Sequence, residues 1–258
     1  MSQRPVLVVG DVQGDVARLH DALAAYPEDE VDTVFLGDFF QGGEPGAGGG
    51  AAAAQVARSR RNARSVLGNH DLFLLAILER SRGGDEVSRW TSRSGGAIED
   101  VWLSRRGDWA DLRAVETDPG LEAWLRGLPL LLMLEDGTLV QHTDDDRYAD
   151  IGATVDDVNA QCAAWLTQPA GVLNALRLTI GRHAFDDEHR LERYLRHFGA
   201  RRVVHGHTPH WDEAPRSQHA GRVIGFDGRF SRYWSPEPGD WGPVGATVAI
   251  LPPAHDLR

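Results

Sequence analysis

Cysteine is almost absent from this sequence of 258 residues, in which Cys162 is the only one. No disulfide can therefore form within the chain, and because Ala163 and Ala164 follow it, we interpret Cys162 as a small buried apolar residue rather than a nucleophile. Long apolar runs are lacking too. The longest, Leu128 to Leu134, is interrupted by Pro129 and is far too short to cross a bilayer. With no signal-peptide pattern either, we expect a cytoplasmic protein without a membrane partner.

The sequence is also short of positive charge. Lys and Arg together number 27 against 38 Asp and Glu, which gives a net charge of -11. A protein that binds duplex nucleic acid needs a basic face, so this balance argues against such a partner. The acidic excess also repels phosphate groups at long range. Any phosphate site must therefore be made locally, by metal ions or by arginines.

Short apolar runs recur along the chain, and five of them end in a small polar cluster. Such runs, rich in β-branched residues and stopped by glycine, predict buried strands. Apolar stripes with helical spacing lie between them, so the pattern predicts an α/β fold. In such folds ligands bind at the carboxyl ends of the strands, where these clusters would converge. The clusters are Gly10-Asp11, Gly37-Asp38, Gly68-Asn69-His70, Gln141-His142 and His205-Gly206-His207.

Two segments depart from this alternation. The stretch Gln41 to Ala54 consists mostly of Gly and Ala, and we expect a flexible loop that grades into a helix at about Ala51 to Arg61. Residues 80–122 predict a helical insertion that could roof the site. Its tryptophans are interpreted as packing residues, with base stacking as the alternative. We expect residues 1–258 to form a single domain that contains this insertion.

The polar clusters supply oxygen and nitrogen donors for metal ions. Mixed carboxylate, amide and imidazole sets suit Mn, Fe, Zn and Ni. Two such ions, roughly 3.5–4 Å apart and sharing one carboxylate, would favour in-line displacement at phosphorus by an activated bridging water. The candidate ligands are Asp11, Gln13, Asp38, Asn69, His142 and His207.

Five motifs in this order resemble those of the calcineurin-like metallophosphoesterases, and they extend from residue 7 to about residue 209. Within that superfamily the chain is similar to the phosphoprotein-phosphatase branch. The nearest pattern is that of bacterial diadenosine-tetraphosphatase-like enzymes and related bacterial serine/threonine phosphatases, and the stretch Leu67 to Ala76 especially resembles the former. The resemblance implies a central β-sandwich flanked by helices, the four-layer metallophosphatase fold. The motifs are Gly10-Asp11-Val12-Gln13-Gly14, Gly37-Asp38, Gly68-Asn69-His70-Asp71, the His142 strand end and Gly206-His207-Thr208-Pro209.

The resemblance also implies two divalent metal ions, for which we expect manganese, with Fe, Zn, Co or Ni as alternatives. Asp11 and Gln13 would hold the first ion, and Asp38 would bridge both. The second ion would be held by Asn69, His142 and His207.

On the substrate side, the resemblance makes His70 the general acid that protonates the leaving oxygen, a task suited to imidazole. Asn69 and His70 would also contact the phosphate. Arg182 stands at about the place where relatives carry a phosphate-binding arginine. Arg93 and Arg105, in the expected insertion, are further candidates.

Three positions depart from the family pattern. Gln13 replaces the usual His with a neutral and weaker ligand. Gln41 stands where an acidic partner of the catalytic His is usual, and it could still orient His70 by a hydrogen bond. Gly42 replaces a phosphate-binding Arg, so another arginine must grip the phosphate.

Other polar residues near these motifs have plainer interpretations. Asp144, Asp145 and Asp146 come shortly after His142, and we interpret them as a solvated acidic turn rather than as ligands. His205 lies two residues before His207 and is either a support for the site or a packed core residue.

The sequence thus predicts a metal-dependent phosphoesterase that hydrolyses phosphate monoesters, on proteins or small molecules, through a hydroxide that bridges two metal ions. One alternative is a hydrolase of dinucleoside polyphosphates or other nucleotides. The other is a catalytically degenerate metal-binding protein, which Gln13, Gln41 and Gly42 motivate. The phosphorylated substrate is the one partner predicted, and the sequence does not specify an oligomeric state.

Overall fold

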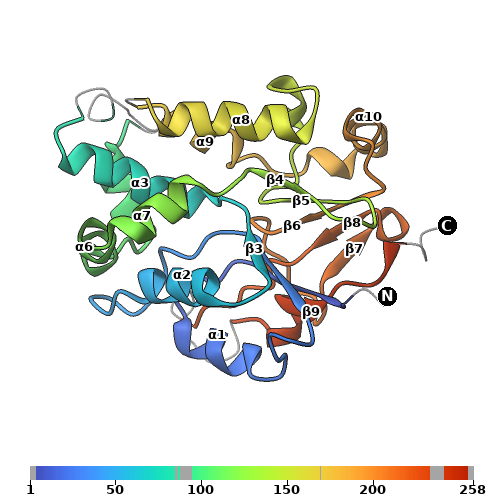
Figure 1. Cartoon of the computed structure of the whole chain (residues 1–258), viewed down its shortest axis with the longest axis horizontal. Helices are drawn as coiled ribbons and strands as arrows, with labels where there is room; N and C mark the ends of the chain where they lie inside the picture. The colour runs from blue at the N-terminus through green and yellow to red at the C-terminus, as the bar shows by residue number, and fades with distance from the viewer. Residues whose placement is uncertain (1–3, 85–86, 88–94, 169, 233–240, 255–258) are drawn as a thin grey trace.

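The computed structural model describes residues 4–84, 87, 95–168, 170–232 and 241–254. Two mixed sheets pack face to face, and helices cover the outer face of each (Figure 1). This is the four-layer α/β sandwich that the sequence predicts. None of the described helices is both long enough and apolar enough to cross a membrane.

The first sheet is built mainly from the N-terminal part of the chain. Its three N-terminal strands run parallel, and the last strand of the chain joins them antiparallel to β1. The carboxyl end of that last strand therefore points away from the carboxyl ends of the parallel strands, and no polar cluster follows it. In order across the sheet the strands are β3 (Ala63–Ser65), β2 (Asp32–Phe35), β1 (Val6–Val9) and β9 (Val248–Ile250).

The second sheet also has a parallel centre, made by β5, β6 and β8, with one antiparallel strand at each edge. Only β5 and β6 are expected from the polar-ended runs, because the other three strands are three residues long and carry no such cluster directly at their ends. The order is β4 (Leu131–Met133), β5 (Thr138–Gln141), β6 (Arg202–His205), β8 (Val223–Gly225) and β7 (Arg216–Gln218).

Alternate strand residues build two separate cores. Val8 in β1 and Val204 in β6 belong to the core between the sheets. Their neighbours Leu7, Val9 and Val203 point the other way and pack in the core beneath the helices. Both faces of each sheet are therefore buried, which is why the strands appear in the sequence as continuous apolar runs rather than as alternating ones.

The helices follow the amphipathic stripes of the sequence. Helices α1 and α2 lie outside the first sheet, whereas α8 and α10 lie outside the second (Figure 1). Asp15 caps α1, since its Oδ1 accepts the N–H of Arg18 at 3.1 Å. The bounds are α1 (Val16–Leu23), α2 (Gly49–Ser59), α3 (Asn69–Ser81), α8 (Val155–Leu166), α9 (Val172–Leu178) and α10 (Glu188–Phe198).

Helix α2 begins at Gly49, slightly before the start at about Ala51 that the sequence predicts. Its first turn contains two glycines, and distant side chains accept hydrogen bonds from the backbone N–H groups at its N-terminus. Asp108 accepts the N–H of Gly48 at 3.0 Å, and Asp111 accepts the N–H of Ala51 at 2.8 Å. The start of the helix therefore depends on carboxylates some 60 residues away, which local composition does not reveal.

Those carboxylates belong to the segment expected as a helical insertion, which is helical where it is described. Arg93 and Trp90 lie outside the described residues. Trp102 is buried and packs edge-on against Trp109, with ring centroids 4.8 Å apart. The helices are α5 (Ile98–Ser104), α6 (Trp109–Thr117) and α7 (Pro119–Arg126).

Candidate metal centre

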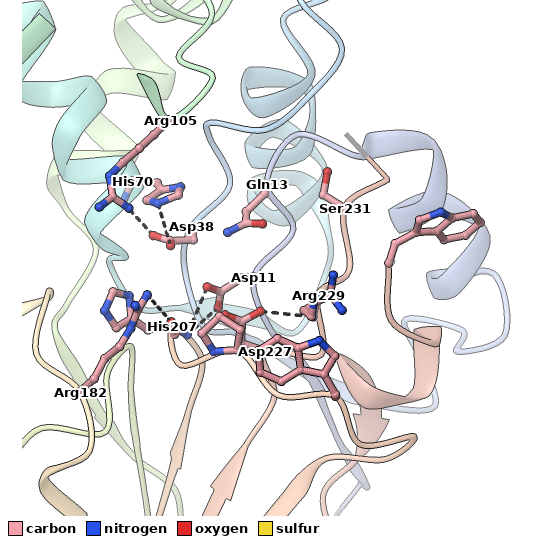
Figure 2. A pocket seen from close by; sticks show the side chains of 13 residues that line it. Asp11, Gln13, Asp38, His70, Arg105, Arg182, His207, Asp227, Arg229 and Ser231 are labelled. Carbon is pink, nitrogen blue, oxygen red and sulfur yellow. Dashed lines mark hydrogen bonds and ion pairs between the residues drawn. The ribbon is translucent and has the colours of Figure 1, made fainter. Parts of the chain in front are cut away.

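The parallel strands of the two sheets deliver polar side chains to one place. From the first sheet, Asp11 follows β1, Asp38 follows β2, and Asn69 begins α3 just after β3. From the second sheet, His142 follows β5 and His207 follows β6. All five side chains are buried. The convergence expected at the strand ends is therefore present. Gln13 lines a cavity together with Asp11, Asp38 and His207 (Figure 2).

Asp38 lies at the middle of this group. Its Oδ1 is 3.3 Å from Nε2 of His142 and accepts the backbone N–H of His70 at 2.8 Å. Its Oδ2 is 3.9 Å from Nε2 of His70. Burial alone would raise the pKa of Asp38, but the nearby His142 and His70 hold it well below its usual range. Asp38 is thus an ionised carboxylate between two imidazoles.

Both ring nitrogens of His142 face oxygen atoms. Its Nδ1 lies 2.7 Å from the carbonyl oxygen of Leu36, and because a carbonyl only accepts, Nδ1 carries a proton. Its Nε2 faces Oδ1 of Asn69 at 2.9 Å, beside Asp38. Burial lowers the pKa of His142, but Asp38 outweighs burial and raises it to about 10. A backbone carbonyl on the far ring nitrogen is the usual support of a metal-binding histidine.

His207 is the second imidazole of the group. Its backbone N–H donates to both carboxylate oxygens of Asp11, at 3.0 and 3.1 Å. Its own Nε2 is buried and has no hydrogen-bond partner among the described residues. Burial holds the pKa of His207 well below its usual value, so the ring is neutral and presents a lone pair. Donor atoms of Asp38, His142 and His207 all lie within 4.8 Å of one another. This arrangement fits a divalent cation.

Three members of the group have left-handed backbone conformations. The φ angles are 48° at Gln13, 55° at Asp38 and 62° at His207. A side chain in this region costs about 1–2 kcal/mol. Such strain persists where the surrounding structure imposes it, and it is enriched at functional sites. It accompanies three candidate ligands here.

Two glycines leave room for the carboxylates. A Cβ at Gly68 would lie 2.1 Å from Oδ1 of Asp38, and one at Gly206 would lie 2.2 Å from Oδ1 of Asp11. No larger residue fits at either position without moving a candidate ligand. The glycines of these motifs thus serve close approach.

The substrate side of the site is a cavity of about 280 Å³ beside Asp38, His70 and His207. Arg182 and Arg105 line it, and Nη2 of Arg182 donates to the carbonyl oxygen of His207 at 2.9 Å. The structure therefore brings Arg182 beside the candidate ligands.

His70 is oriented by the main chain. Its Nδ1 donates to the carbonyl oxygen of Phe40 at 3.2 Å. Gln41 was a possible partner for His70, but its amide nitrogen Nε2 donates instead to the carbonyl oxygen of Trp102 at 3.1 Å. Burial lowers the pKa of His70, and the charge of Asp38 opposes this effect.

The interpretation of Asp144 to Asp146 as a solvated turn is wrong for the first two residues, which are buried. Asp144 accepts hydrogen bonds from Oγ1 of Thr208 and from the backbone N–H of His183, the latter at 2.9 Å. It thereby ties the loop after β5 to the loop after β6. His205 is buried, and its Nδ1 donates to the carbonyl oxygen of Gly206 at 2.8 Å.

Asp227 is a residue of this cavity that sequence reasoning missed. It is buried, lines the cavity and follows β8 by two residues. Burial raises its pKa to about 6, and Asp38 adds to this effect. A signal was present in the sequence, because the run Val223 to Gly225 resembles the other apolar runs that lead into an acidic residue.

The family model for calcineurin-like phosphoesterases matches residues 4–211, which is most of the chain. The chain belongs to the calcineurin-like phosphoesterase family. Members of this family are hydrolases of phosphoric esters, and the family implies divalent metal ions. The resemblance drawn from the five motifs is thereby confirmed.

Comparison with individual proteins extends this picture. The phosphoesterase is 28% identical over 195 residues to a symmetrical bis(5'-nucleosyl)-tetraphosphatase from Ralstonia nicotianae; the match covers 68% of this chain and 61% of that protein. The chain thus spans about three-fifths of the curated relative's length.

Solved structures show the same fold at low identity. A cold-active protein-tyrosine phosphatase from a Shewanella species superposes with a TM-score of 0.61 at 22% identity, over 97% of this chain and 81% of that one. A putative diadenosine tetraphosphatase superposes with a TM-score of 0.50 at 17% identity, over 88% and 84%.

Proposed function

We propose that this protein hydrolyses phosphate monoesters in a metal-dependent reaction centred on Asp38. The observation that carries this proposal is the position of one ionised, buried carboxylate in contact with two imidazoles, His142 and His70. The two imidazoles would have different roles. His142 would help to bind a metal ion, and His70 would donate a proton.

The residues divide naturally around Asp38. Asp11 and Gln13 would hold one ion, and Asn69, His142 and His207 would hold the other, with Asp38 shared. When bound, such ions supply positive charge for the phosphate oxygens and ease deprotonation of a water nucleophile. Manganese is our first expectation for the metal.

His70 is placed to protonate the leaving oxygen. Because its Nδ1 keeps a proton for the carbonyl of Phe40, a proton given from Nε2 requires the ring to be an imidazolium. Asp38, 3.9 Å away, favours that charged state, whereas burial disfavours it. Proton transfer from His70 would restore a neutral ring that retains its hydrogen bond to Phe40.

Arg182 and Arg105 would bind the phosphate oxygens, because Gly42 stands where the family usually has a phosphate-binding arginine. Both line the cavity beside Asp38. Guanidinium groups bind phosphate through two parallel N–H bonds, which gives orientation as well as charge. Asn69 and His70 would add further contacts. We also propose that residues 1–258 form a single domain with an insertion at about 80–122. The proposed location of the protein is the cytoplasm.

The test combines metal analysis with turnover of para-nitrophenyl phosphate. The wild-type chain should hold close to two metal ions by elemental mass spectrometry and release phosphate when manganese is added. Asp38→Asn should abolish turnover, and Asp156→Asn, on the surface of α8, should leave it unchanged. Full activity in Asp38→Asn would overturn the proposal. Bound metal without turnover in the wild-type chain would favour the catalytically degenerate metal-binding alternative.

A second candidate function is hydrolysis of dinucleoside polyphosphates, which one wall of the cavity favours. Trp211 lines the cavity, is 74% exposed and lies under the guanidinium of Arg229, 5.2 Å from its ring centroid. A flat ring with a cation beside it suits a nucleobase joined to several phosphates. The Ralstonia relative bears the name of such an enzyme.

Product analysis separates the two functions. A symmetrical dinucleoside tetraphosphate should yield two nucleoside diphosphates, whereas a monoester yields inorganic phosphate. If the nucleotide is the substrate, Trp211→Ala should raise KM for it about fivefold or more, since stacking on an aromatic side chain contributes about 1–3 kcal/mol. The same variant should leave KM for para-nitrophenyl phosphate within about twofold. Equal effects on both substrates would remove the support for a nucleobase site.

A further inference from the structure

Asp227 occupies the sixth strand end around the candidate metal centre. The parallel strands β1, β2 and β3 lead to Asp11, Asp38 and Asn69, as described above. On the second sheet β5, β6 and β8 are parallel, and the first two lead to His142 and His207. Asp227 stands two residues beyond β8, so the third parallel strand of that sheet also delivers a potential ligand. The established motifs leave this place unassigned.

The carboxylate of Asp227 is buried beside that of Asp11. Figure 2 shows the two groups next to each other on the cavity wall, with Gln13 above them. The side chain of Asp227 accepts the backbone N–H of Arg229 at 3.3 Å. A backbone amide does not neutralise a carboxylate.

Like charges at this depth need a shared proton or a cation to offset them. Within the described residues, neither Asp11 nor Asp227 has a side-chain ion pair at 4.0 Å or less. Two buried carboxylates without a counter-ion are strongly unfavourable, and a bound metal ion removes that cost. A neighbouring part of the same cavity also points to a bound cation, because the buried Nε2 of His207, a candidate ligand of the second ion, has no hydrogen-bond partner among these residues.

Gln13 explains why a further carboxylate belongs on this side of the centre. Its amide is a neutral and weak ligand, so Asp11 and Gln13 together bring a single negative charge to the first ion. The opposite side has two imidazoles, His142 and His207, as stronger donors. An additional carboxylate beside Asp11 restores the charge and donor strength that the amide lacks.

We propose that Asp227 is part of the metal-binding set, acting with Asp11 and Gln13 to hold the first ion. This inference rests on the proposed metal centre and is independent of the substrate. It makes the centre a cluster of three carboxylates, Asp11, Asp38 and Asp227, rather than two.

The test is titration of the metal-free chain with Mn²⁺, followed by calorimetry. The wild-type chain should bind two ions, and Asp227→Asn should weaken one of the two sites at least tenfold. Asparagine can still accept the N–H of Arg229, so the local hydrogen bond is kept. Asp212→Asn is the matched control, because Asp212 is an exposed carboxylate nearby, 3.7 Å from Nδ1 of the buried His210. This control should bind both ions as tightly as the wild type.

A second readout separates a metal-binding role from a structural one. Without metal, Asp227→Asn removes a like charge beside Asp11, so its melting temperature should rise above that of the wild type. Its gain in melting temperature on adding Mn²⁺ should then be smaller. Gln13→His in the Asp227→Asn background should restore the weakened site, since imidazole is the stronger donor.

Two results would overturn the inference. One is unchanged affinity at both sites in Asp227→Asn, and the other is a lower melting temperature of the metal-free variant, which would mark a structural role. Asp38→Asn run alongside distinguishes this failure from failure of the proposed function. If Asp38→Asn also binds two ions normally, the whole centre is misassigned. If Asp38→Asn loses the ions, only the assignment of Asp227 as a ligand is wrong.

Discussion

The carboxylate of Asp71 holds the backbone of Asp38 in place. Oδ2 of Asp71 accepts the N–H of Asp38 at 3.0 Å, and Oδ1 accepts that of Phe39 at 2.9 Å. Oδ2 also accepts the N–H of Gly68, at 2.9 Å. One buried side chain at the start of α3 thus satisfies three amides in two loops. It offers a means to keep Asp38 in its left-handed conformation, with φ at 55°.

Replacing Asp71 with Asn should therefore disturb the site without emptying it. The amide nitrogen of Asn cannot accept, so at least one of the three N–H groups loses its partner, at a cost of about 1–3 kcal/mol. We expect this loss of unfolding free energy in urea denaturation, together with weaker Mn²⁺ binding. Asp157→Asn is the control, because Asp157 also sits in the first turn of a helix but is exposed. Equal stability of the two variants would contradict the proposed role of Asp71.

Gln13 tests how much backbone strain the centre carries. With φ at 48°, any side chain at this position is strained, and only glycine is free of that cost. Gln13→Gly and Gln13→Ala both remove the amide ligand, but only the first removes the strain. The Gly variant should therefore be more stable than the Ala variant by about 1 kcal/mol, with similar weakening of metal binding. An Ala variant as stable as the Gly variant would mean that the conformation is unstrained.

Asp111 should make stability depend on pH. Burial raises its pKa from 3.8 to about 7 in the folded chain, where it accepts the N–H of Ala51. Its ionisation is therefore less favourable in the folded state than in the unfolded one. Stability falls as pH rises from about 4 to about 7, and the loss is complete above that range.

Unfolding of the metal-free chain between pH 5 and 8 measures this effect. Asp111→Asn should lose less stability than the wild type over this range, by up to about 1.4 kcal/mol per pH unit below pH 7. Asp156→Asn, an exposed carboxylate in α8, should follow the wild type. A parallel pH profile of Asp111→Asn and the wild type would show that Asp111 ionises in the folded chain as it does in the unfolded one.

Arg182 should determine how tightly the phosphate is bound. Arg182→Ala removes a guanidinium that lines the cavity, so KM for para-nitrophenyl phosphate and the inhibition constant of inorganic phosphate should each rise at least tenfold. Arg182→Lys keeps the charge but loses the two-pronged grip, and its effect should be intermediate. Arg177→Ala, on the exposed side of α9, should change neither constant. If Arg182→Ala behaves like this control, another arginine grips the phosphate.

Much of the fold and many of the candidate ligands were predictable from the sequence, because the pattern that marks them is local. A buried strand followed by a glycine and a donor residue identifies Asp11, Asp38 and His207 without long-range information. Residues that act through distant contacts were not predictable in this way. Asp144 looks like a solvated turn until its contact with Thr208 is known.

Local sequence patterns were enough to predict the main strands and helices and the polar residues at the strand ends, since apolar periodicity and turn chemistry act over a few residues. Which of these residues lie together, and what each one contacts, follows from the packing of the folded chain. The start of α2 depends on Asp108 and Asp111, the orientation of His70 depends on a carbonyl oxygen, and the position of Asp227 depends on the pairing of β8 with β6. The physical reason is that buried polar groups must find partners wherever packing brings them, and packing joins segments that are far apart in the chain.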